Sequence, residues 1–145
     1  MIDFTVETEI AHPPSDVFAY VTDPSKLHTW QTNTVSAEVQ GGGPLVLGSR
    51  LRERHRAPGG KELDSVVEVA EFEPPRAFAL RMVEGSLPLD AHIRLEPSGD
   101  GTRMAFRVHG QPTGAMRVMQ PLLRLTVKRQ FASYCATLKR ILEAT

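Results

Sequence analysis

Hydrophobic residues recur at steps of three and four along the C-terminal part of the chain, from residue 115 onward, which is the period of one helix face. The apolar positions in this stretch are Met116, Met119, Leu123, Val127, Phe131, Tyr134, Leu138 and Leu142. A basic set, Arg117, Arg124 and Lys128, falls on another face. Because Pro121 cannot donate a helical hydrogen bond, we predict a turn or kink before about Gln120 and a long helix from near Pro121.

Before this helix the pattern is mainly that of β-strands. Residues 2–10 alternate apolar and polar side chains without a break, which is typical of a strand buried on one face. The pair Pro13-Pro14 suits the first turn of a short helix, and Asp23-Pro24 suits the start of a second one that ends near Trp30. A strand near residues 34–40 and a run of hairpins up to about residue 110 follow.

The pairing of the hairpin strands can be predicted because a correct register matches charges on one face and apolar side chains on the other. The first hairpin then pairs Arg50 with Glu68, Arg54 with Asp64, Arg56 with Glu62, Leu51 with Val67 and His55 with Leu63. The later hairpins pair Val67 with Met82, Glu68 with Arg81, Val69 with Leu80, Ala91 with Val108, Ile93 with Phe106 and Leu95 with Met104. The outcome is an antiparallel sheet of about seven strands with one apolar face.

Such a sheet is too long to stay flat, so it curls and its apolar face becomes concave. The C-terminal helix is the only predicted element long enough to fill that concavity. We therefore predict a single α+β domain over residues 1–145, in which the curved antiparallel sheet wraps around the long C-terminal helix and two short helices follow the first strand. Any ligand is expected between sheet and helix.

Four polar side chains, Glu53, His55, Ser65 and Glu84, fall on the predicted inner face. Glu53 pairs with Ser65, and the same register places Ser65 opposite Glu84, so these three are expected close together. A carboxylate in a half-apolar site has its pKa raised by desolvation and could act as an acid or base, which makes Glu53 and His55 the candidate catalytic residues. In the alternative interpretation, which we favour, the four are hydrated and chemically inert but still orient a ligand.

Aromatic and thioether side chains are expected to line the interior: Trp30, Phe78, Phe106, Phe131, Tyr134, Met82, Met104, Met116 and Met119. Such walls suit a planar or flexible apolar ligand, although core packing explains them equally well. Tyr134 differs because a buried phenol needs a hydrogen-bond partner. The full predicted ligand-binding set is Trp30, Leu51, Glu53, His55, Ser65, Val67, Met82, Glu84, Phe106, Leu123, Val127, Phe131 and Tyr134.

Composition and motifs narrow the range of partners. The chain carries 17 basic and 17 acidic residues, so no global field attracts nucleic acid or a membrane. The ladder Arg50, Arg52, Arg54 and Arg56 resembles a nucleic-acid stripe, but three of its members have predicted carboxylate partners. The five histidines show no metal spacing, and we expect neither a metal nor a cofactor. The single Cys135 is interpreted as an inert core thiol.

Neither a signal peptide nor an apolar run long enough to cross a bilayer is found in the sequence. We therefore expect a cytoplasmic protein without stable membrane insertion, and the sequence leaves the oligomeric state open.

The glycine loop Gly41 to Gly43 lacks the Lys-Ser/Thr of a phosphate-binding loop, so we interpret it as a flexible hairpin connection that could gate the cavity mouth.

Short sequence words in this order resemble one large superfamily. They are His12-Pro13-Pro14, Thr22-Asp23-Pro24, Trp30, Gly48-Ser49-Arg50-Leu51, Glu71-Phe72-Glu73-Pro74-Pro75, Gly101-Thr102-Arg103 and Arg129-Gln130-Phe131. Together they are similar to the START-related (SRPBCC) superfamily of polyketide cyclases, lipid-transfer proteins and birch-pollen-allergen-like binders, over the whole chain. The resemblance implies the helix-grip fold and a cavity that holds a small apolar or aromatic molecule.

Three functions stay open on this fold. The first is a binding or carrier protein for a small hydrophobic molecule, which the apolar interior favours. The second is a polyketide cyclase or dehydratase-like enzyme that uses an inward-facing acid or base; the aromatic cyclases that the resemblance implies use inward-facing arginines, whereas the predicted registers turn the arginines outward. The third is a protein-interaction module that would use the open sheet face or the helix.

Overall fold

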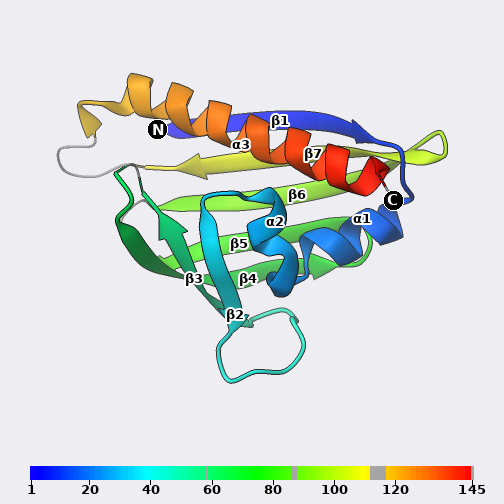
Figure 1. Cartoon of the computed structure of the whole chain (residues 1–145), viewed down its shortest axis with the longest axis horizontal. Helices are drawn as coiled ribbons and strands as arrows, with labels where there is room; N and C mark the ends of the chain where they lie inside the picture. The colour runs from blue at the N-terminus through cyan, green and yellow to red at the C-terminus, as the bar shows by residue number, and fades with distance from the viewer. Residues whose placement is uncertain (58, 86–87, 112–116, 145) are drawn as a thin grey trace.

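A computed structural model of the chain describes residues 1–57, 59–85, 88–111 and 117–144. Seven antiparallel strands form one sheet in the order β1-β7-β6-β5-β4-β3-β2. The strands are β1 (Ile2–Ile10), β2 (Thr34–Val39), β3 (Arg50–Arg56), β4 (Glu62–Glu73), β5 (Ala77–Glu84), β6 (Leu89–Ser98) and β7 (Gly101–Gly110). Figure 1 shows this curved sheet with the long helix α3 (Gln120–Glu143) along one side of it. The predicted α+β helix-grip fold is confirmed.

Two short helical segments follow β1, as the proline pairs predict. The helix α1 (Pro14–Val21) has a proline at its first position, where a missing N–H costs little. The 3₁₀ helix η1 (Pro24–Lys26) is capped by Asp23, whose carboxylate accepts a hydrogen bond from the Ser25 amide at 3.0 Å. It leads directly into α2 (Leu27–Trp30), which ends on the buried Trp30.

The predicted hairpin registers are confirmed through most of the sheet. β3 and β4 pair as charge and apolarity require, with Arg54 opposite Asp64 and the two side chains 3.0 Å apart. The predicted apolar pairs of β4 with β5 and of β6 with β7 are also present. Ion pairs therefore neutralise the outer face, including that between Arg81 and Glu68 at 3.0 Å.

One predicted pairing is wrong. The residue opposite Glu84 is Val66 and not Ser65, because the register shifts between Val66 and Val67, where β5 carries one extra residue. Such a bulge moves every later side chain on the strand by one position. Glu84 is therefore exposed at the end of β5, away from the predicted trio.

The helix α3 packs on β1 and against α2 through the C-terminal part of its apolar stripe. Leu138 is fully buried, and Val127, Tyr134 and Leu142 are nearly so. The helix begins at Gln120 with Pro121 in its first turn, as predicted. The predicted burial of Met119 is wrong: this side chain is 58% exposed, because it precedes the helix at the rim of the sheet. Met116 lies outside the described residues.

No helix within the described ranges is long and apolar enough to cross a membrane.

Leu138 tests how far the core depends on α3. We expect Leu138→Ala to lower the free energy of unfolding by about 3 kcal/mol, because the removed side chain is fully buried and leaves a cavity. Leu125→Ala on the exposed face of the same helix is the matched control and should change it by no more than about 0.5 kcal/mol. Urea unfolding curves measure both values. Equal losses in the two variants would contradict this packing.

Candidate functional site

A cavity of about 960 Å³ lies between the concave face of the sheet and α3. Its walls are mainly apolar. Every member of the predicted ligand-binding set except Leu51 and Glu84 lines it: Trp30, Glu53, His55, Ser65, Val67, Met82, Phe106, Leu123, Val127, Phe131 and Tyr134. The part of α3 that faces the cavity therefore runs from Leu123 to Tyr134.

The two exceptions have separate causes. Leu51 is buried on β3 and belongs to the packed interior without lining the cavity, although its cross-strand partner Val67 does line it. Glu84 is turned away by the bulge described above. Of the other predicted interior methionines, Met104 is fully buried in the core without lining the cavity, and Met119 is exposed.

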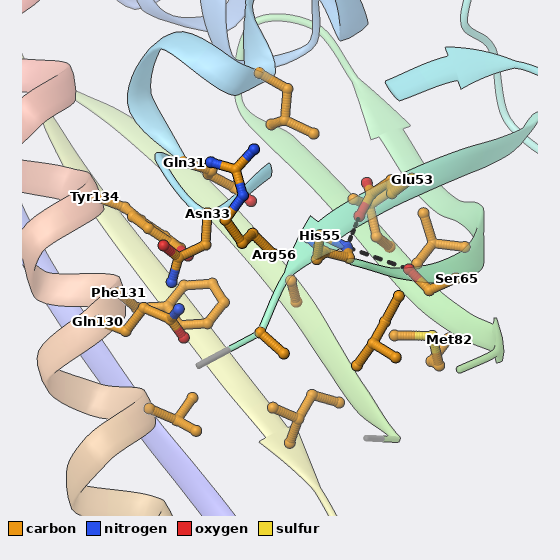
Figure 2. Close-up of a pocket in the computed structure, with 18 of the residues that line it drawn as sticks. Gln31, Asn33, Glu53, His55, Arg56, Ser65, Met82, Gln130, Phe131 and Tyr134 are labelled. Atoms are coloured by element: carbon orange, nitrogen blue, oxygen red, sulfur yellow. Dashed lines mark hydrogen bonds and ion pairs between the residues drawn. The ribbon is translucent and has the colours of Figure 1, made fainter. Parts of the chain in front are cut away.

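A polar cluster around the half-buried His55 interrupts the apolar wall where β2, β3 and β4 run side by side. The Nε2 atom of His55 lies 3.0 Å from Oε1 of Glu53 and 3.2 Å from Oγ of Ser65. Its Nδ1 atom lies 3.3 Å from Oγ1 of Thr34 on β2. Glu53, Ser65 and Thr34 are all buried, and Figure 2 shows the Glu53 and Ser65 contacts converging on the His55 ring.

The geometry of this cluster limits its chemistry. In a serine hydrolase, one imidazole nitrogen accepts the serine proton while the other donates to a carboxylate. Here Glu53 and Ser65 share the same nitrogen of His55, so an Nε2–H that donates to Glu53 cannot also accept the Ser65 proton. The cluster is suited to holding a proton beside the cavity or to hydrogen-bonding a ligand, and not to nucleophilic attack by Ser65.

The aromatic side chains form a connected wall. Phe131 on α3 contacts Phe106 and Tyr134 edge to face, with 5.2 Å between ring centroids in each pair. Trp30 packs 6.1 Å from Phe106 and is fully buried, and its indole N–H has no hydrogen-bond partner among the described residues. These rings both pack in the core and line the cavity. Core packing and ligand binding, the two interpretations of the aromatic residues, are therefore compatible.

Tyr134 presents a protonated phenol to the cavity. Burial raises the pKa of the phenol to about 12, although hydrogen bonds from the backbone and side chain of Asn33 lower this pKa in part. Its hydroxyl therefore stays neutral at physiological pH and is already tied to the segment that follows α2.

Sequence reasoning missed the polar side chains that line the cavity beside Tyr134: Gln31, Asn33, Arg56, Arg129 and Gln130. Figure 2 shows Arg56 lying near Gln31 and Asn33, with Gln130 on the facing side of α3. Arg56 was predicted to face outward, and it does lie 3.7 Å from Glu62, but as the last residue of β3 it also borders the cavity. Its position at a strand end was the available signal.

The glycines that line the cavity are Gly59 and Gly60, in the turn between β3 and β4. The loop Gly41 to Gly43, predicted as a gate, does not line it. Within the described part of the chain, no group of three or more His, Cys, Asp or Glu side chains could hold a metal ion.

Cys135 lies on the buried side of α3, outside the cavity wall. Burial raises the pKa of its thiol to about 11, and a hydrogen bond with Thr8 lowers this pKa by a smaller amount. The prediction of a core thiol is confirmed.

Comparison with known proteins gives one family match and a set of similar folds. The family model described as "Polyketide cyclase / dehydrase and lipid transport" matches residues 1–143. No curated protein matches the chain in sequence.

Three solved structures illustrate the similarity of fold. The crystal structure of TTHA0849 from Thermus thermophilus has a TM-score of 0.82 at 20% identity, over 98% of this chain and 97% of that one. The polyketide cyclase-like protein Cgl2372 from Corynebacterium glutamicum has a TM-score of 0.71 at 21% identity, over 98% and 91%. Ara h 8.0201 has a TM-score of 0.71 at 15% identity, over 99% and 98%. At these identities the likeness establishes the fold alone.

The burial of Cys135 can be tested directly because it is the only cysteine. At about pH 8, a pKa of about 11 leaves roughly one thiol in a thousand as the reactive thiolate. We expect Ellman's reagent to label the folded protein at least about 100-fold more slowly than the protein in guanidinium, with the rate rising as the pH approaches the raised pKa. Equal rates in the folded and unfolded states would contradict the burial.

Proposed function

The chain belongs to the polyketide cyclase / dehydrase and lipid transport family, and from that premise we propose that it binds or carries a small hydrophobic or aromatic molecule. The observation that carries the proposal is the cavity of about 960 Å³ between the sheet and α3. Small-molecule sites commonly occupy a few hundred to about 1,000 Å³, with mainly apolar walls and a few polar groups that fix orientation. This cavity has both properties.

The lining suggests the chemistry of the ligand. Its apolar body would lie against Phe106, Phe131 and Met82, where contact with the walls gains dispersion energy and removes apolar surface from water. A hydrogen-bonding group on it would meet either the Glu53 and His55 cluster or the polar side chains around Asn33. We therefore propose a ligand that is largely apolar and carries one or two polar groups.

A second candidate function is proton-transfer catalysis on the bound molecule. The observation that favours it is the buried Glu53 carboxylate, held 3.0 Å from His55 in the cavity wall. A positioned acid or base of this kind contributes about 100-fold to 10,000-fold to a rate. Cyclase-like chemistry through inward arginines has partial support, because Arg56 and Arg129 border the cavity although Arg50 and Arg54 form ion pairs on the outer face.

Ligand binding can be followed through Trp30, the only tryptophan, which lines the cavity. We expect 1-anilinonaphthalene-8-sulfonate to quench its emission by energy transfer. Ala91→Phe adds a ring inside the cavity and should weaken probe binding roughly 10-fold or more, because the ring takes up ligand volume. Ala132→Phe, on the exposed side of α3, is the control and should leave the affinity unchanged.

Native mass spectrometry of protein purified from its own host complements the probe. A co-purifying mass on the order of a few hundred daltons, absent from Ala91→Phe, is expected for a molecule that fits the cavity. A folded Ala91→Phe variant that binds probe as tightly as wild type would overturn the cavity as the binding site.

Glu53→Gln separates the carrier from the enzyme. If the chain is an enzyme, this variant should lower kcat for the identified co-purifying molecule at least about 100-fold while probe affinity stays unchanged. Glu84→Gln is the matched control, since the same change is made on the exposed end of β5. Wild-type protein that leaves the molecule unaltered supports a carrier, and undiminished turnover by Glu53→Gln removes Glu53 from the mechanism.

A further inference from the structure

The start of α3 and the turn before it expose an unusual number of large apolar side chains. Val118 is 86% exposed, Met119 58%, Leu122 59% and Leu125 45%. On the helix, Leu122 and Leu125 follow each other at a step of three and so lie on one face. Exposed apolar side chains gathered in this way generally mark an interaction site.

Four basic side chains lie in the same segment as this apolar group. Arg117, Arg124, Lys128 and Arg129 are all exposed, and none of the chain's 17 acidic residues lies between Gly101 and Leu142. We call these four together with Val118, Met119, Leu122 and Leu125 the basic apolar patch. The whole chain therefore has no net charge, but the surface at the start of α3 is strongly positive.

The basic side chains of the patch differ from those of the sheet in having no carboxylate partner among the described residues. Most arginines on the outer sheet face have carboxylate partners, as in the pairs of Arg107 with Asp3 and of Arg103 with Glu9. Across the described ranges, none of the ion pairs involves the four basic side chains of the patch. Arg124 acts on the Asp3 carboxylate only as a weaker, longer-range charge.

We propose that the basic apolar patch docks on the surface of an anionic lipid bilayer. Apolar side chains next to Lys and Arg fit the boundary between lipid headgroups and acyl chains. There the apolar side chains enter the acyl layer, while the Lys and Arg side chains meet the phosphate groups of the lipids. Leu123 and Arg129 in the same helical segment line the cavity, so docking would bring the cavity to the membrane surface. The docking itself does not depend on what the cavity binds.

Other occupants fit the patch less well. Single-stranded nucleic acid is bound through aromatic side chains that stack on bases, and none of the exposed apolar side chains of the patch is aromatic. A second copy of the chain, docked face to face, would bring the unpaired basic side chains of two patches together, which is repulsive. An acidic protein surface is left as an outcome of the test.

Vesicle co-sedimentation tests the proposal with the whole chain. Wild-type protein should bind vesicles that contain phosphatidylglycerol and not vesicles of phosphatidylcholine alone, and rising NaCl should weaken binding because screening shortens the range of the charges. Each positive charge near an anionic surface contributes about 5-fold to the partition coefficient, so Arg124→Gln/Lys128→Gln should lower it roughly 25-fold. Arg52→Gln/Arg140→Gln makes the same net change at exposed sites elsewhere and should leave binding nearly unchanged.

The apolar contribution needs its own pair of variants. Leu122→Ser/Leu125→Ser should lower the partition coefficient at least about 5-fold, because these side chains no longer enter the apolar layer. Val46→Ser/Leu47→Ser, which changes two exposed aliphatic residues in the loop between β2 and β3, is the control. Circular dichroism confirms that each variant is folded.

Three outcomes would overturn the proposal. They are failure of wild type to bind anionic vesicles, equal binding to neutral ones, and equal losses in patch and control variants. A dimer in solution that Leu122→Ser/Leu125→Ser dissociates would assign the patch to a second copy instead. Binding to an acidic polypeptide such as polyglutamate, without binding to vesicles, would assign it to a protein partner.

Discussion

The concave face of the sheet is wider than one helix can cover, and this mismatch shapes the rest of the structure. α3 packs on β1 and against α2, where its fully buried Leu138 belongs to the core. The inner side chains of β3, β4 and β5 lie farther from that contact and line the cavity instead. Figure 1 shows the same arrangement, with α3 along β1 and the strands β3 and β2 on the opposite side. One helix thus closes the core with its C-terminal turns and forms a wall of the site with its middle turns.

Most of the fold could be predicted because each hairpin had to satisfy two independent conditions. Matching Arg54 with Asp64 and Leu51 with Val67 leaves one register, and the structure has it. Prediction failed at the bulge that displaces Glu84, which adds one residue to β5. Its only mark in the sequence is the adjacent apolar pair Met82 and Val83, where the alternation of the strand breaks. It also failed for Arg56 and Asn33, because the alternation of a strand does not set the direction of side chains at its end or in a loop, which tertiary packing decides.

The polar groups in the cavity wall, together with Thr34 beside it, fall into two sets that differ in burial. Glu53, Ser65 and Thr34 are buried around His55, so their positions are held by the strands and by their contacts with the ring. Asn33, Arg56 and Arg129 are exposed, so water competes for their hydrogen bonds. Buried polar groups discriminate strongly between ligands because an unmatched partner is costly, whereas exposed ones contribute little. Selectivity is therefore expected from the inner set.

The place of β1 in the sheet has a consequence for how the chain folds. β1 lies at the sheet edge, paired with β7 and covered by α3, and the residues joined by its Asp3–Arg107 ion pair are 104 positions apart. β1 therefore waits for β7 and α3 before Ile2 and Phe4 are buried. Pairing over such separations is slow, and unpaired apolar strands are prone to aggregate meanwhile. Completion of this fold consequently depends on contacts between segments far apart in the sequence, and loss of α3 would first release β1.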